Sequence, residues 1–373
     1  MVIDAPSPSV AVEIAGRVFE AGTPGFAEAV AGAYAARRRP RCQCRPAGIE
    51  MYVARLNDGY IVKRMPQTGN QHAPDCPSFE LSPGLSGLAQ LLGTAIVENP
   101  ATGNTTLRLD FPLSKSPARS AHQPASSAPG SVSTPMDRLS LRGLLHYLWD
   151  QAELTHWRPS FDGKRSWVTV RRHLLRAAEQ KLAGGYPLSA RLYVPEVFAL
   201  DQLEPINARR RASWTPARQQ PSRAQNLMLI IAEVKGIVPG RRGYKAVLKH
   251  VPDVAFALDD PLYRRVGKRF GQELDLWSAS EDIHMVMAAT FGLTAAGVPE
   301  IVNLCLMPVT RHWLPVETVF EHQLVHRLVR EGRGFQKTLR YDLARSERIP
   351  CVALTDRGEP VLLNADGETI APT

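Results

Sequence analysis

The sequence is poor in cysteine and contains no long apolar run. Only five of its 373 residues are cysteines, and the longest apolar run, residues 227–232, is far too short to cross a bilayer as a helix. Residues 1–16 also lack the basic start and apolar stretch of a secretory signal. These absences argue against a membrane protein and predict a cytoplasmic protein without a membrane partner.

Motifs of several enzyme classes are missing as well. The chain has no glycine-rich loop of the kind that cradles phosphate, and no nucleophile can be paired with a base. Apolar residues make up 44% of the chain and charged residues 22%, which is ordinary for a soluble globular protein. The 45 Lys and Arg outnumber the 36 Asp and Glu and give a formal net charge of +9. This balance favours nucleic acid or another polyanion as a partner.

Composition divides the chain into four parts. Residues 1–112 are expected to form an N-terminal zinc-binding module, and residues 113–136, rich in Ser, Ala and Pro, a flexible linker. Residues 137–185 form a helical segment that resembles a winged-helix or helix-turn-helix unit, although a helical hairpin without special function looks the same. Residues 186–373 are expected to form a C-terminal mixed α/β domain. The predicted fold class is α+β, with a small N-terminal zinc-binding β-hairpin module linked to a larger mixed α/β domain.

Periodicity predicts individual elements in these parts. Apolar residues at helical spacing predict helices over residues 26–37, 263–270, 283–291 and 319–331. Short β-rich runs predict strands over residues 192–198, 227–235 and 301–308, and hairpins over residues 95–111 and 352–363. The mixture of helices and strands in the second half is the basis of the mixed α/β assignment.

Three of the five cysteines lie near one histidine. Cys42 and Cys44 form a Cys-x-Cys pair, and His72 and Cys76 form a His-x-x-x-Cys pair. Two such pairs supply the four nitrogen and sulfur ligands that tetrahedral zinc prefers. Because the protein fills all four positions, the zinc is expected to be structural and not catalytic. The alternative, scattered thiols and a surface histidine, is disfavoured by the doubled short spacing.

The insert between the two pairs explains how they meet. Residues 51–56 and 60–65 are β-rich and flank the hairpin signal Asn-Asp-Gly at 57–59, which returns the chain to the first pair. The other two cysteines, Cys305 and Cys351, lie within apolar segments. They are therefore expected to be buried thiols without a role in metal binding.

The same blocks carry a resemblance to a known family. Segments along most of the chain are similar to the bacterial domain-of-unknown-function 1173 family, which is marked by cysteines towards its N-terminus. These segments are residues 41–46, 51–53, 61–66, 72–77, 157–159, 332–337 and 339–342. The resemblance implies an uncharacterised protein, often associated with plasmids or integrated mobile elements, and it implies no activity.

Basic residues surround the predicted zinc site and recur in the second half of the chain. Together with nearby aromatic residues they suit contact with a phosphate backbone. The candidate nucleic-acid-binding residues are Arg38, Arg39, Arg45, Lys63, Arg64, Arg210, Arg211, Trp214, Arg241 and Arg242. The open alternative is that these cations only solvate the surface and, near the zinc site, offset the charge of the thiolates.

A catalytic site is predicted from two acidic residues in the second half. Glu196, which follows a proline, and Glu233 with Lys235 follow the order of a metal-dependent nuclease pattern. In that pattern two acidic groups hold Mg²⁺ and a lysine positions the attacking water. Pro-Glu replaces the usual Pro-Asp, and the two acids are further apart in sequence than the pattern prefers. The competing explanation is therefore that this pattern of acids and lysine occurs in the sequence by chance.

Three functions follow from the sequence. The first is a zinc-containing, nucleic-acid-binding accessory protein of a bacterial mobile element, with no catalysis assigned. The second is a Mg²⁺-dependent nuclease that uses Glu196, Glu233 and Lys235. The third is a scaffold in which the zinc module and the linker recruit a protein partner. Whether the nucleic acid is DNA or RNA is left open.

Overall fold

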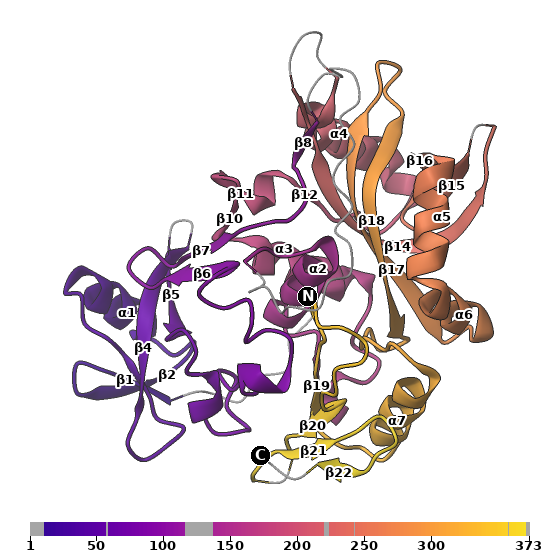
Figure 1. Cartoon of the computed structure of the whole chain (residues 1–373). Coiled ribbons are helices and arrows are strands. Elements are labelled where there is room, and N and C mark those ends of the chain that lie inside the picture. Colours follow the sequence, from indigo (N-terminus) through magenta and orange to yellow (C-terminus); the bar gives the residue numbers. More distant parts are fainter. Residues whose placement is uncertain are drawn as a thin grey trace.

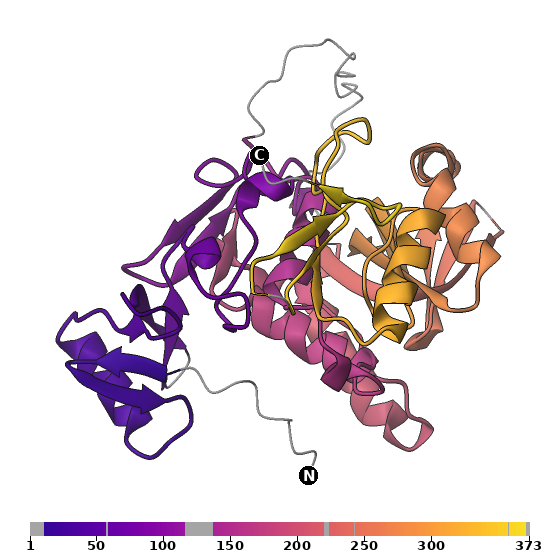
Figure 2. The same ribbon diagram turned by 90° about the horizontal axis from the view of Figure 1, so that it is seen from below.

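The structure is a computed structural model that describes residues 11–56, 59–115, 137–219, 224–241, 243–356 and 358–370. Helices and mainly antiparallel sheets both contribute, which confirms the α+β class. No helix in these ranges is both long and apolar enough to cross a membrane. Figure 1 and Figure 2 show the N-terminal sheet at one end of the molecule and the largest sheet towards the other.

The N-terminal sheet has five strands in the order β2-β1-β3-β4-β5. Helix α1 (Phe26–Ala35) confirms the predicted first helix, and its Val30 and Ala33 are buried against Val12 and Ile14 of the sheet. This small core is separate from the main core of the molecule. The strands are β1 (Ala11–Ile14), β2 (Arg17–Glu20), β3 (Arg41–Cys42), β4 (Ile49–Leu56) and β5 (Gly59–Arg64).

A second sheet joins segments from both sides of the predicted linker. Strand β7 (Asn104–Leu107) forms a hairpin with β6 (Ile96–Asn99), as predicted, and pairs in parallel with β10 (Lys181–Ala183). Strand β11 (Tyr186–Pro187) completes the order β11-β10-β7-β6. Strand pairing therefore connects the first 112 residues directly to the chain beyond residue 136.

Most of the predicted linker, residues 116–136, lies outside the described residues. Its first residues form strand β8 (Ser114–Lys115), which pairs with β13 (Gln225–Asn226). The start of this segment is therefore tied to the second half of the chain by backbone hydrogen bonds.

Helix α2 (Leu141–Gln151) forms the centre of the main core. Leu144, Leu145 and Leu148 recur at helical spacing and are almost fully buried. The helix begins at Ser140, whose side-chain oxygen accepts a hydrogen bond from a backbone N–H of the first turn. Helix α3 (Trp167–Ala178) packs against α2 and adds the buried Trp167, Val170 and Leu174 to the same core.

The largest sheet closes on itself. Its strand order is β12-β14-β15-β16-β18-β17, and β14 also pairs with β17. A closed sheet of this kind buries one face around a common interior. The strands are β12 (Leu192–Tyr193), β14 (Met228–Pro239), β15 (Tyr244–Leu248), β16 (Val251–Leu258), β17 (Ile283–Leu293) and β18 (Pro299–Thr310).

The prediction of a helix over residues 283–291 is wrong. These residues belong to β17, which pairs with β14 on one side and β18 on the other and is buried along nearly its whole length. A short, continuous apolar run has the same appearance in a buried strand and in a buried helix. The predicted strand over residues 192–198 is also reduced, because only β12 within it is a strand.

Three helices accompany this sheet. Helix α4 (Leu203–Trp214) precedes β13 in the chain, and α5 (Asp260–Arg269) and α6 (Gly271–Ala279) pack against β18, with α6 also contacting β17. Helix α5 confirms the helix predicted over residues 263–270. In Figure 1, α5 and α6 lie outside the closed sheet.

The C-terminal part is a small sheet with its own core. Helix α7 (Val319–Arg330) and the hairpin of β20 and β21 confirm the predicted elements. Strand β9 reaches this sheet from between α2 and α3, so the C-terminal part is joined to the helical segment. The order is β22-β21-β20-β19-β9, formed by β22 (Thr369–Ile370), β21 (Val361–Leu363), β20 (Val352–Leu354), β19 (Phe335–Lys337) and β9 (His156–Trp157).

Short 3-10 helices occur in the connections between these elements. They are η1 (Gly69–Gln71), η2 (Pro83–Leu85), η3 (Pro159–Phe161), η4 (Leu188–Ala190), η5 (Leu200–Gln202) and η6 (Thr215–Ala217). The first of them, η1, leads directly into the second pair of predicted zinc ligands.

Candidate metal centre

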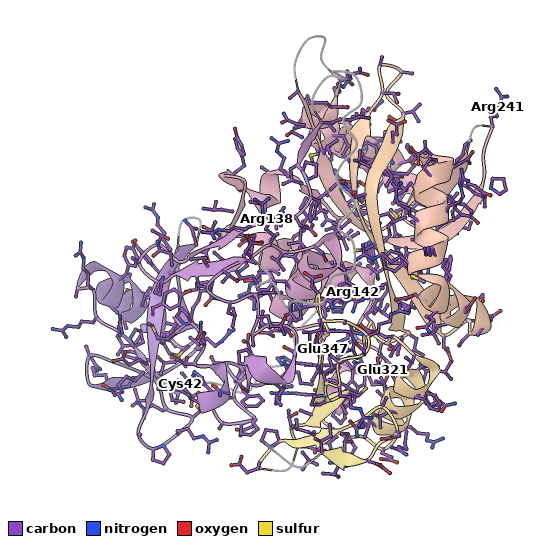
Figure 3. All side chains as sticks on the ribbon, viewed as in Figure 1. Cys42, Arg138, Arg142, Arg241, Glu321 and Glu347 are labelled. Atoms are coloured by element: carbon purple, nitrogen blue, oxygen red, sulfur yellow. The ribbon has the colours of Figure 1, made fainter. Side chains whose placement is uncertain are left out.

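The four predicted zinc ligands meet beside the N-terminal sheet. Cys42 ends strand β3, and Cys44 follows in the turn towards β4. The antiparallel β4–β5 hairpin brings the chain back, although residues 57 and 58 at its tip lie outside the described part. His72 directly follows η1, and Cys76 lies one turn later. Figure 3 marks Cys42 within this end of the molecule.

The ligand atoms have the spacing of a tetrahedral site. The Sγ atoms of Cys42 and Cys76 are 3.7 Å apart, and the Nδ1 atom of His72 lies 3.4 Å from Sγ of Cys44 and 3.6 Å from Sγ of Cys76. All four ligand atoms lie within 4.8 Å of one another. Zn–S bonds of about 2.3 Å and a Zn–N bond of about 2.0 Å require S–S separations of about 3.8 Å and S–N separations of about 3.5 Å. The four residues therefore fit zinc.

Backbone hydrogen bonds favour charged thiolates at this site and oppose the effect of burial, which disfavours them. Cys42 and His72 are fully buried. The N–H of Ala73 donates to Sγ of Cys44 (3.5 Å), and the N–H of Ser78 donates to Sγ of Cys76 (3.4 Å). Such donors stabilise the charged form of a ligand. With no open position among the four, the arrangement is that of a structural metal.

The thiols do not share one protonation state when no metal is bound. The hydrogen bond with Cys42 and the proximity of His72 lower the pKa of Cys76 to about 4. The same bond, together with burial, raises the pKa of Cys42 well above its usual value, and burial raises the pKa of Cys44. Without a metal, the thiolate form is therefore favoured at Cys76 alone, because a second negative charge beside it would be repelled. A divalent cation removes this repulsion because it binds all three sulfurs in their deprotonated form.

A tight turn holds the second ligand pair in place. The carbonyl oxygen of Gly69 accepts hydrogen bonds from the N–H groups of His72 (3.2 Å) and Glu80 (3.1 Å). A Cβ atom at Gly69 would lie only 2.6 Å from Cβ of Glu80. Met51 and Phe79 pack against the buried cysteines on the other side. Glycine at this position is therefore a steric requirement of the site.

The basic residues around the metal site differ in how far their charged groups are free to contact a ligand. Arg38 is exposed, Arg45 is half-buried, and Arg39 is exposed but forms a surface ion pair with an acidic residue of β4. Lys63 donates to the side chain of Gln180, which directly precedes β10 (3.2 Å). Arg64 forms an ion pair with Glu80 in partly buried surroundings. Lys63 and Arg64 therefore connect parts of the fold instead of facing solvent as predicted.

The basic candidates in the second half divide in the same way. Arg210 is 6% exposed, and both its terminal nitrogens donate to the carboxylate of Asp253. Trp214 is 5% exposed and packs edge-on against three aromatic rings of the core. Neither side chain is therefore accessible to a nucleic acid in the structure. Arg211 and Arg241 are exposed, whereas Arg242 lies outside the described residues.

The predicted nuclease residues have separate partners. Glu196 accepts two hydrogen bonds from Arg209 (2.9 and 2.7 Å), which lower its pKa. Glu233 is buried and accepts hydrogen bonds from Lys249 and His284, whereas Lys235 is exposed. Within the described ranges, neither acid belongs to a group of three or more ligand residues spaced to hold a metal. The structure thus offers no support for the Mg²⁺ site.

Sequence reasoning named Arg241 but missed the other members of the basic surface to which it belongs. The inner face of α5 carries Leu262, Val266 and the following Phe270 at helical spacing, which turns Arg264, Arg265 and Lys268 towards solvent. The hairpin of β14 and β15 is fixed to α5 by stacking of Tyr244 on Tyr263, with ring centroids 3.4 Å apart. Figure 3 shows Arg241 at the tip of this hairpin. The α5 basic surface is defined here as Arg241, Arg264, Arg265 and Lys268.

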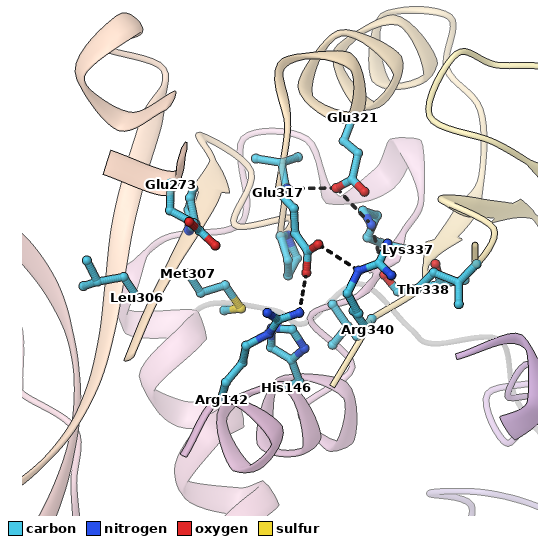
Figure 4. A pocket seen from close by; sticks show the side chains of 15 residues that line it. Arg142, His146, Glu273, Leu306, Met307, Glu317, Glu321, Lys337, Thr338 and Arg340 are labelled. Carbon is cyan, nitrogen blue, oxygen red and sulfur yellow. Dashed lines mark hydrogen bonds and ion pairs between the residues drawn. The ribbon is translucent and has the colours of Figure 1, made fainter. Parts of the chain in front are cut away.

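A polar cavity lies between α2, the start of α7 and the segment after β19. Glu317 bridges Arg142 and Arg340, at 3.1 Å from each, and Lys337 lies 3.3 Å from Glu321 (Figure 4). The volume open to the centre of a water molecule is about 20 Å³, which suffices for a water molecule and not for a substrate. The paired charges make this cavity a structural network.

Comparison with known proteins gives one match. A family model described as "Protein of unknown function (DUF1173)" matches residues 12–368, nearly the whole chain. No curated protein and no solved structure matches the sequence. The family match confirms the predicted resemblance, and its description names no activity.

Proposed function

Because the chain belongs to the DUF1173 family, whose description names no activity, we propose a function from its own residues. The protein binds nucleic acid through its α5 basic surface, and zinc at Cys42, Cys44, His72 and Cys76 keeps the N-terminal module folded. The association with mobile elements that the family resemblance implies stays a prediction.

The observation that carries this proposal is the concentration of unneutralised charge on the α5 basic surface. Arg241, Arg264, Arg265 and Lys268 are all exposed, and within the described part of the chain none of them forms a salt bridge. Asp259 begins the helix and accepts a hydrogen bond from a backbone N–H of its first turn (2.7 Å). The outward face of α5 carries Arg264, Arg265 and Lys268 against a single exposed acid of the helix, Asp260 in its first turn. This excess of positive charge suits the regular charges of a phosphate backbone.

The metal has a supporting role in this proposal. A closed four-ligand zinc site contributes folding energy to a small module and leaves no position for a substrate. Arg38 and Arg45 lie on the surface of that module. They provide a second, weaker positive area at the opposite end of the molecule from α5 (Figure 1).

The experiment is a fluorescence-anisotropy titration of the zinc-loaded protein with labelled single-stranded DNA, duplex DNA and RNA of one sequence. For a duplex, log K should fall linearly with log salt concentration, with a slope of about −0.9 for each phosphate contacted. Absence of salt-dependent affinity for all three probes at low ionic strength would overturn the proposal.

A further inference from the structure

The carboxylate of Glu233 collects donors from two distant segments. Glu233 lies on β14, and its side chain is 5% exposed. Its Oε1 atom accepts hydrogen bonds from Nδ1 of His284 (2.7 Å) on β17 and from Nζ of Lys249 (2.9 Å) in the turn between β15 and β16. Nε2 of His250, from the same turn, lies 3.8 Å from Oε2. A buried carboxylate is costly unless it is paired, so these donors explain its presence in the sheet.

The imidazole of His284 is held in one orientation. Its ring stacks on Trp313, with centroids 4.7 Å apart and planes only 3° from parallel. Trp313 has a φ of 63°, a strained value for a residue with a side chain, and its carbonyl oxygen accepts a hydrogen bond from Nε1 of Trp149 (3.2 Å). Trp167 packs against the same indole at 5.4 Å. A rigid aromatic support of this kind fixes the ring before any ligand arrives.

The pairing leaves one nitrogen of His284 for chemistry. Because Nδ1 donates its proton to Glu233, the neutral ring carries its free lone pair on Nε2. A carboxylate that holds a histidine in this tautomer is the arrangement by which histidine acts as a general base. The side chain of His284 is 24% exposed and that of Lys249 is 50% exposed, so both can be reached from solvent.

We propose that His284 and Lys249 form a site that cleaves RNA by transesterification, with Glu233 as the positioning residue. This proposal rests on the proposed nucleic-acid binding. Nε2 of His284 takes the proton of a ribose 2′-hydroxyl, whose oxygen attacks the adjacent phosphorus. The new O2′–P bond forms as the P–O5′ bond breaks, and the departing 5′-oxygen takes a proton from water. The hydroxide that remains takes the proton from Nε2 of His284 and restores the neutral imidazole. Lys249 stabilises the negative charge on the phosphorane oxygens. The products are a 2′,3′-cyclic phosphate and a 5′-hydroxyl end.

The first test uses a 5′-labelled RNA oligonucleotide and its all-DNA counterpart in metal-depleted buffer, with the zinc content of the protein verified. The wild-type protein should cut the RNA, leave cyclic phosphate ends, and leave the DNA intact because DNA lacks the nucleophile. His284→Ala should lower the cleavage rate at least about 100-fold, as expected for loss of a general base. His326→Ala, which removes an exposed histidine of α7, should leave it unchanged.

A contaminating ribonuclease would cut equally in all preparations, so equal cleavage by wild type and His284→Ala would overturn the assignment. Cleavage of the DNA at a comparable rate would overturn the stated nucleophile and with it the proposal. RNA that is bound but not cut would overturn this inference and leave the proposed binding function in place. RNA that is neither bound nor cut would contradict both.

The role of Glu233 needs a separate measurement. Glu233→Gln retains an oxygen that accepts from His284 and removes the charge. A positioning role predicts that kcat falls at least about tenfold while RNA affinity, measured by anisotropy, is unchanged. Circular dichroism must show that the variant is folded. An unchanged kcat in the folded variant would overturn this role.

Discussion

The sulfur atoms of Cys42 and Cys76 lie 3.7 Å apart although the two residues are separated by 34 positions. This is the separation that zinc imposes on two tetrahedral sulfur ligands, about 3.8 Å. The β4–β5 hairpin and the turn at Gly69 therefore place the ligands at the required distances through the fold of the protein chain itself.

Replacing a zinc ligand should unfold only the N-terminal module. Cys42→Ser is expected to reduce bound zinc from one per chain to near zero, because a structural zinc supplies about 10–16 kcal/mol of apparent binding energy that depends on the full ligand set. Limited proteolysis should then cut within residues 11–81 first. Cys305→Ser is the matched control, since Cys305 is equally a buried, free cysteine but far from the cluster. Equal zinc in both variants would contradict the site.

The histidine of the polar cavity should make stability depend on pH. Burial and nearby Arg142 lower the pKa of His146 to about 3, from its usual 6.5. The unfolded chain therefore takes up this proton first as the pH falls. The stabilising contribution is complete above about pH 6.5 and is lost progressively towards about pH 3, by at most about 1.4 kcal/mol per pH unit.

His146→Gln isolates this contribution, because its side-chain oxygen can still accept the hydrogen bond from the N–H of Tyr341. Urea unfolding at about pH 7.5 and about pH 5.5 should show that the wild type loses about 1 kcal/mol more than the variant. Identical pH dependence of the free energy of unfolding in the two proteins would show that His146 is not the group responsible.

The ion pair of Lys337 and Glu321 should show coupling between mutations. Lys337 is 4% exposed, so Lys337→Met leaves the buried charge of Glu321 unpaired and should cost about 3–5 kcal/mol. Adding Glu321→Gln removes that charge while retaining an acceptor for the N–H of Glu317. The double variant should therefore be more stable than Lys337→Met alone by at least about 1 kcal/mol in urea unfolding. Additive destabilisation would argue against a charge pair.

Local signals in the sequence were sufficient for several features. The cluster of four candidate metal ligands was predictable because two short-spaced pairs flank a hairpin, and α7 because Leu324, Val325 and Leu328 repeat at helical spacing. Cys305 and Cys351 are buried thiols, as their apolar surroundings indicated. In each case the information lies within a few tens of residues.

Features that depend on distant contacts were not predictable. Residues 283–291 are a strand because β14 and β18 flank them, and a single apolar run carries no record of its partners. Trp214 at the end of helix α4 is buried by aromatic rings of strands β16 and β17, although its arginine-rich neighbourhood suggested an exposed position. The contact between Glu233 and His284 joins residues 51 positions apart. A sequence motif pointed to Glu233, but it could not show that His284 is its partner.

The most direct test of the central claim compares two charge reversals of equal size. Arg264→Glu with Arg265→Glu alters the α5 basic surface, and Arg327→Glu with Arg330→Glu alters exposed arginines of α7. Measured by anisotropy with one labelled duplex, the α5 variant should lose at least about tenfold in affinity and reduce the salt slope by about two, one for each contact. The α7 variant should bind as the wild type does. Equal affinity of the α5 variant and the wild type, or equal losses in both variants, would contradict a nucleic-acid interface on α5.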